Sequence, residues 1–149
     1  MSIRVTVSGA DRSPLRRFNF PAEASRWAAV VGPAVHDALR REAPVAPVKG
    51  GRLRDSVRFE RHIGTGSAQL VFTADTPYTR YVLEGTAAHI IRPRTARALR
   101  FQHGGQTRFA RLVQHPGTRA NPFPTRAIKP LLPLIQQRFS QIVSASLRG

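Results

Sequence analysis

The first residues of the chain alternate strictly between apolar and polar. Ile3, Val5 and Val7 have polar neighbours, a period of two that predicts a short, half-buried strand. From about residue 22 to residue 42 apolar residues instead recur at steps of three and four, which predicts an amphipathic helix. Its expected apolar face consists of Trp27, Val30, Val31, Ala34, Val35, Ala38 and Leu39.

Glycine and proline mark the turns between the next elements. Residues 44–51 predict a linker, and Gly64-Thr65-Gly66 predicts the turn of a hairpin whose strands run through residues 57–59 and 70–72. Residues 77–86 predict a single helical turn stopped by Gly85. Further strands are expected at residues 89–92, 99–103 and 107–113, the last two joined by Gly104-Gly105.

A turn and a helix start are predicted within residues 115–123. Pro116-Gly117 suits a type II turn, and Asn121 before Pro122 is typical of an N-cap and a first helical residue. Because prolines break helices, Pro130 and Pro133 predict either a kink near Lys129 or a helix that starts at Pro130. The apolar face of this C-terminal helix is expected at Leu131, Leu132, Ile135, Phe139, Ile142 and Val143.

Taken together, the pattern predicts one α+β domain over residues 1–149. Its sheet is expected to be mainly antiparallel, with a long N-terminal helix and a C-terminal helix packed against it. A chain of 149 residues fits a single domain. The absence of cysteine excludes a disulfide framework, a thiolate metal site and a cysteine nucleophile. The longest uncharged apolar stretch, residues 27–35, is too short to span a bilayer, and the N-terminus lacks a signal-peptide core, so we expect a soluble, unexported chain.

The formal charge is +16, from 24 basic and 8 acidic residues, and it is unevenly distributed. Residues 1–84 contain all the acids and carry +5, whereas residues 85–149 contain no acid and carry +11. Such a surface favours a polyanion or an acidic protein as partner. An alternative is that the excess of 22 arginines over 2 lysines reflects a GC-rich coding sequence, with the arginines on solvated faces. That alternative does not explain the missing acids.

No arrangement of residues indicates catalysis. The five histidines form no closely spaced pair with metal-ligand spacing, and the serines lack the context of a catalytic nucleophile. Gly64-Thr65-Gly66 lacks the lysine of a phosphate-binding loop. The carboxylates Asp55 and Glu84 have arginines nearby in sequence, so ion pairing is the expected role of each. We therefore expect no enzyme, no cofactor and no metal site. The histidines are His36, His62, His89, His103 and His115, and the serines considered as nucleophiles are Ser13, Ser56 and Ser67.

A run of arginines crosses the strands predicted between residues 92 and 111. Phe101 and Phe109 are the aromatic residues that interleave with it, and both fall at apolar strand positions, where core packing is the favoured interpretation over base stacking. No sequence-reading nucleic-acid module is recognisable. Contact with DNA phosphates and contact with an acidic protein both stay open for Arg92, Arg94, Arg97, Arg100, Arg108 and Arg111.

Four motifs follow one another in a fixed order along the chain. They are Ala46-Pro47 with residues 51–57, then residues 78–86, then Leu99-Arg100-Phe101, then His115-Pro116-Gly117-Thr118 with Asn121-Pro122-Phe123. Each motif alone is common, but four in the same order and spacing form a moderately specific signal. Over about residues 22–147, this ordered set resembles a known family, the tail-completion or minor tail proteins of long-tailed, siphovirus-like phages.

The resemblance implies a structural virion protein of the head–tail connection, or neck, assembled as a hexameric or other ring. Its implied partners are other copies of itself, adjoining head-closure, tail-terminator or tail-tube proteins, and packaged DNA through nonspecific backbone contact, but no membrane. The implied location is the virion, and the host cytoplasm during assembly. Alternatives are a tail-terminator or head-closure ring protein, or a small basic nucleic-acid-binding module. The expected subunit or ring interface contains Tyr78, Tyr81, Glu84, Arg92, Arg94, His115 and Asn121.

Overall fold

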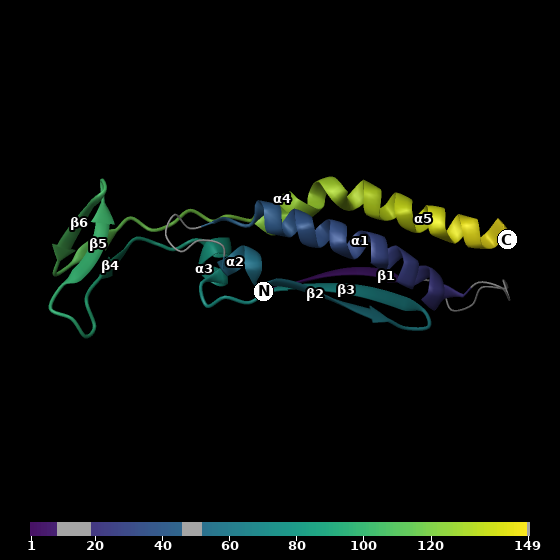
Figure 1. Ribbon diagram of the computed structural model, residues 1–149, viewed down its shortest axis with the longest axis horizontal. Helices are drawn as coiled ribbons and strands as arrows, with labels where there is room; N and C mark the ends of the chain where they lie inside the picture. The colour runs from purple at the N-terminus through teal and green to yellow at the C-terminus, as the bar shows by residue number, and fades with distance from the viewer. Residues whose placement is uncertain (9–18, 46–51, 149) are drawn as a thin grey trace. The chain divides into compact units, whose positions relative to one another are not determined.

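A computed structural model of the chain describes residues 1–8, 19–45 and 52–148 (Figure 1). Ser13, the Ala46-Pro47 motif and residues 46–51 of the linker expected at residues 44–51 lie outside the described residues. The chain divides into two compact units. We call Met1–Thr79 with Pro122–Gly149 the core unit, and Arg80–Asn121 the insert. The expectation of a single domain stays a prediction.

The sheet of the core unit has three antiparallel strands in the order β1-β3-β2. These are β1 (Ser2–Ser8), β2 (Val57–Ile63) and β3 (Ser67–Ala74), as the alternating pattern and the Gly64-Thr65-Gly66 turn predicted. The register places Val5 opposite Leu70, and Phe59 opposite Phe72. Alternate residues of β3 are buried, so one face of the sheet contributes to the hydrophobic core.

Helix α1 (Phe20–Glu42) confirms the long N-terminal helix. Asn19 caps it, since its side chain accepts a hydrogen bond from the backbone N–H of Ala22. Val30, one residue on the expected apolar face of this helix, is not buried but 51% exposed. Successive helical residues differ in direction by about 100°, so Val30 points away from the face on which its neighbour Val31 is buried. A one-turn helix, α2 (Arg52–Asp55), lies between the expected linker and β2, and the sequence pattern did not predict it.

The C-terminal helices pack on α1, which lies between them and the sheet (Figure 1). This corrects the expectation that the C-terminal helix covers the sheet. Trp27 of α1 is fully buried and donates its indole N–H to the carbonyl of Ile135, 3.3 Å away, so α1 supplies the surface on which the C-terminal helix rests. The elements are α4 (Phe123–Ile128), the 3₁₀ turn η1 (Lys129–Leu131) and α5 (Leu132–Arg148).

The start of α4 differs from the prediction. Pro122, not Asn121, occupies the cap position, and no side chain caps the helix. The backbone N–H of Asn121 instead donates to the carbonyl of Val82, 2.9 Å away. The break between the C-terminal helices falls at η1, near the kink expected at Lys129.

The insert begins at the second residue of α3 (Thr79–Glu84) and also contains two separate antiparallel ribbons. Strand β4 (His89–Ile91) pairs with β7 (Val113–His115), and β5 (Leu99–His103) pairs with β6 (Gln106–Ala110). The strand predicted over residues 107–113 is therefore two strands with different partners. Residues 92–98 connect β4 to β5, whereas only residues 111–112 connect β6 to β7. Because these two segments differ in length, they cannot pair residue by residue, and one strand ladder cannot continue through them.

Candidate assembly interface

Two segments far apart in sequence lie against each other where the insert begins and ends. We call their pairing the crossing, and this end of the insert its base. Thr86 and Thr118 exchange backbone hydrogen bonds of 2.9 and 3.0 Å, and the Thr118 N–H also lies 3.0 Å from the Thr86 hydroxyl. Together with the bond from Asn121 to Val82, this pairing holds the two ends of the insert side by side. The crossing joins two sequence motifs, residues 78–86 and residues 115–123.

Glycine is required on both sides of this crossing. Gly85 and Gly117 adopt φ values of 74° and 91°, which side chains disfavour. A Cβ on Gly85 would lie 2.4 Å from the carbonyl oxygen of Thr118, and one on Gly117 would lie 2.3 Å from that of Thr86. The two glycines therefore permit a mutual backbone approach that alanine would prevent. The predicted stop of α3 at Gly85 and the positive φ expected at Gly117 are both confirmed.

The histidines His89 and His115 lie opposite each other in the β4–β7 ribbon, with ring centroids 5.0 Å apart. Nδ1 of His115 accepts the N–H of Gly117 at 3.1 Å, and Nδ1 of His89 lies 2.9 Å from the Ala87 carbonyl. Each ring thus stabilises its own turn locally. Among the described residues, no group of three or more histidines and carboxylates is placed to hold a metal ion.

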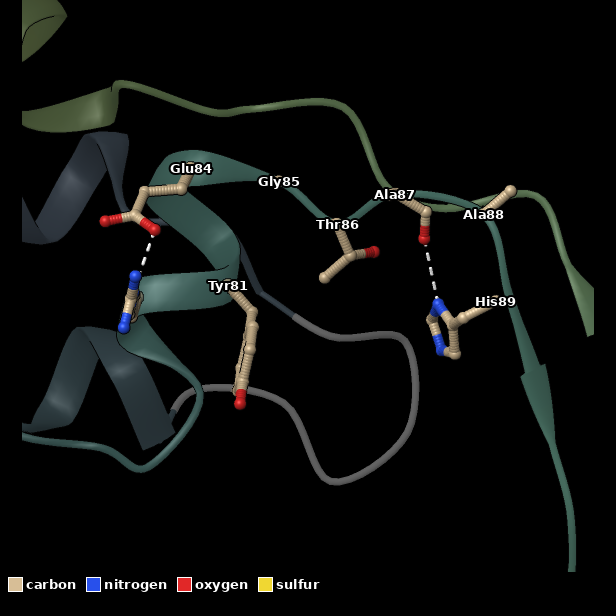
Figure 2. A pocket seen from close by; sticks show the side chains of 8 residues that line it. Tyr81, Glu84, Gly85, Thr86, Ala87, Ala88 and His89 are labelled. Carbon is tan, nitrogen blue, oxygen red and sulfur yellow. Dashed lines mark hydrogen bonds and ion pairs between the residues drawn. The ribbon is translucent and has the colours of Figure 1, made fainter.

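An open hollow of about 700 Å³ lies beside α3 (Figure 2). Arg80 and Glu84 form an ion pair across one turn of the helix, with Nε and Oε2 2.8 Å apart. This hydrogen bond raises the pKa of the Arg80 guanidinium above its ordinary value. Tyr81 and His89 extend from the two ends of this segment (Figure 2), so the lining is largely solvated side chains and backbone rather than an enclosed catalytic cavity.

The β5–β6 hairpin exposes both of its phenylalanines. Phe109 is 68% and Phe101 is 36% exposed, so the interpretation of both as core residues is wrong. The register places Arg100 opposite Phe109, and Arg108 opposite Phe101. Because successive strand residues point to opposite faces and paired residues share a face, each face of the hairpin presents one arginine and one phenylalanine.

The insert has no interior of its own. Within residues 80–121, all of which the structure describes, no residue is buried, whereas eighteen hydrophobic residues are buried in the described part of the core unit. The insert contains eight arginines and a single carboxylate, Glu84, giving a formal charge of +7. Further large apolar side chains are exposed on it, namely Tyr81, Ile90 and Leu112. A unit of this size without a core requires another surface for stability.

The predicted interface residues fall mainly in the insert. Tyr78 belongs to the core unit, while the others, and all six arginines proposed for DNA or an acidic partner, lie within residues 80–121. His115 lies at the crossing, and Asn121 contributes its backbone there. Two of the six arginines lie in the β5–β6 ribbon and the other four in loops, and none of the six lines the hollow.

Three further candidates have structural contacts. Asp55 pairs with Arg40 at 3.3 Å, and Glu84 with Arg80, as expected for both carboxylates. His36 lies 3.1 Å from the Val57 carbonyl and beside the ring of Phe59. These contacts give each of the three side chains a structural partner.

Sequence reasoning missed the pairing of Thr86 with Thr118 and the exposure of the two phenylalanines. Glycines in both motifs indicated a close backbone approach, but a glycine alone does not show which backbone segment approaches it. The alternation of arginine with phenylalanine was visible in the sequence, but it indicates exposed rings only if no layer covers the hairpin.

Comparison with known proteins identifies a family for part of this chain. Residues 15–85 match the family model HK97-gp10_like, described as "Bacteriophage HK97-gp10, putative tail-component". No curated protein and no solved structure gives a significant match. In the described part of the chain, no helix has the length and hydropathy needed to cross a membrane. Over residues 15–85, the family match confirms the resemblance expected from the ordered motifs.

Proposed function

We propose that the protein is a structural subunit of the head–tail connection of a long-tailed phage, where it joins or completes the tail as a member of a ring. In this role it makes and breaks no covalent bonds. The observation that carries the proposal is the insert, which is fixed at its base by the Thr86–Thr118 crossing but buries none of its own residues. Such a unit is suited to be completed by neighbouring subunits or adjoining proteins.

The family match supports the tail assignment, and the composition of the insert supports the assembly role. Arginine and aromatic residues are enriched at the centres of protein interfaces, and the insert exposes both. We place the ring contacts at the hollow beside α3 and at the crossing, with Tyr81, Glu84 and His115 among the contacting residues. Arg92 and Arg94 extend this surface along the loop after β4.

Deletion of the gene from the phage that encodes it tests the proposal. We expect filled heads and separate tails of normal length by electron microscopy, with attachment restored when the wild-type chain is supplied. Tails of abnormal length would instead indicate a tail terminator, and emptied heads a head-closure protein. Infectious particles that contain none of the chain would refute the structural role altogether.

A further inference from the structure

In the described part of the chain, no layer covers either face of the β5–β6 hairpin, and none of its residues is buried. Its turn residues, Gly104 and Gly105, have positive φ values, and a Cβ on either would meet nothing within 4 Å. Phe101 and Phe109 are exposed, and the register places them on opposite faces. A two-stranded hairpin is only marginally stable in water without packing against another element. A partner that stabilises this hairpin must therefore offer apolar contacts to both faces.

The partner must also be acidic. Arg100 and Arg108 accompany the two phenylalanines, and the insert carries +7 with only Glu84 as an acid. Glu84 is already paired with Arg80. Because guanidinium groups match carboxylates bidentately, a groove that combines carboxylates with apolar pockets complements this surface in both respects.

A second copy of the chain is a poor source of those carboxylates. The described residues contain seven, of which four contact an arginine and two lie beside a histidine ring. The chain as a whole carries +16, so two copies repel each other at long range. Charge complementarity thus favours a different, acidic protein over another copy.

Double-stranded DNA satisfies the arginines but not the phenylalanines. Contacts with phosphates and sugars position a protein on the duplex, and they leave apolar side chains on the hairpin in water. Phe109, at 68% exposed, would gain nothing from such contacts. The two exposed rings therefore favour a protein groove over a phosphate backbone.

We infer that the β5–β6 hairpin is a docking element that orders against an acidic, apolar-lined groove of an adjoining tail or neck protein. Phe101 and Phe109 fill apolar pockets on the two sides, while Arg100 and Arg108 pair with carboxylates at their rims. The inference rests on the proposed structural role, and it adds the chemistry of the partner and the residues that recognise it.

The test uses the full chain and three probes, namely a random copolymer of glutamate and tyrosine, polyglutamate of similar length, and a mixed-sequence DNA duplex. Binding is measured by fluorescence anisotropy in about 0.15 M salt, where long-range charge effects are screened. Hydrogen exchange of residues 99–110 reports ordering of the hairpin. We expect the copolymer to bind more tightly than polyglutamate and to protect residues 99–110.

Substitutions distinguish hairpin docking from general attraction to polyanions. Phe109→Ser should weaken binding of the copolymer about tenfold, as for a central interface aromatic, while Val30→Ser, at an exposed apolar site on α1, should change it by less than about twofold. Arg108→Gln should weaken copolymer binding more than Arg61→Gln, which removes the same charge from an exposed position of β2.

Three results would overturn the inference. Equal effects of Phe109→Ser and Val30→Ser would show that the hairpin is not the docking element. Tighter binding of the duplex, with protection of residues 99–110 that is independent of Phe109, would indicate phosphate recognition. Self-association by sedimentation that depends on Phe109 would indicate a second copy as the partner. Because gene deletion tests the structural role separately, any of these results could occur while that role stands.

Discussion

The crossing at the base of the insert permits a quantitative prediction for Gly117→Ala. The new Cβ would lie 2.3 Å from the backbone oxygen of Thr86, and φ at this position is 91°. Backbone strain of this kind costs about 1–3 kcal/mol, and each of the two Thr86–Thr118 hydrogen bonds contributes about 1 kcal/mol. We therefore expect about 3 kcal/mol of local destabilisation. The obstacle is backbone, so no side-chain rotation relieves it.

Amide hydrogen exchange measured by NMR is the appropriate assay, because it reports local opening separately from global unfolding. Gly117→Ala should raise the exchange rates of the Thr86 and Thr118 amides roughly 100-fold. If the free energy of local opening is smaller than the destabilisation, these rates should instead reach those of an unstructured amide. The amides of β3 should keep their wild-type rates, since β3 belongs to the core unit.

Gly104→Ala is the matched control. Its φ of 59° is also positive, but a Cβ there meets nothing within 4 Å, so only the conformational cost of about 1 kcal/mol applies. Exchange at Thr86 and Thr118 should hardly change in this variant. If Gly117→Ala exchanged like Gly104→Ala, the close backbone approach would not be what fixes the crossing.

Three predictions concern the core unit, each measured as the free energy of unfolding in urea. Trp27→Ala should cost about 3–5 kcal/mol, because it empties a fully buried site and removes the hydrogen bond to Ile135; a loss below about 1 kcal/mol would contradict the packing of α5 on α1. Gly32→Ala should lower the free energy of unfolding by about 1 kcal/mol or more, despite the better helix propensity of alanine. The reason is that the new Cβ would lie 2.6 Å from the ring of Phe59, and this ring is packed between His36 and Phe72. Unchanged or increased stability would show that the ring can move aside, and Val30→Ala at an exposed site of the same helix is the control. Asn19→Ala should cost about 1 kcal/mol through loss of the α1 cap, whereas Asn19→Ser should retain most of the stability; equal losses in both variants would argue against capping.

The sequence predicted the core unit more completely than the insert, for a physical reason. In β1 and α1 the apolar period is imposed by a core that covers one face, so it reports the element directly. The place of α5 was harder to predict, because an apolar helix face does not say whether a sheet or another helix covers it.

The insert has no core to impose such a period. Residues 107–113 were predicted as one strand because nothing in their pattern marks the change of partner between β6 and β7. Phe101 and Phe109 were assigned to the core on the assumption that aromatic strand residues have a covering layer within the same chain. That assumption fails where the layer belongs to another molecule. The candidate interface could thus be located by its charge, but its contacts could not be derived.

The bond between Val82 and Asn121 has an evolutionary consequence. It brings the two ends of residues 80–121 together, and a segment whose ends meet can be lengthened, shortened or exchanged with little effect on the scaffold that carries it. The family match ends at residue 85, close to the point where this segment begins. In the proposed role, replacing this one segment would change which virion component the protein attaches to, while the fold that supports the segment stays the same.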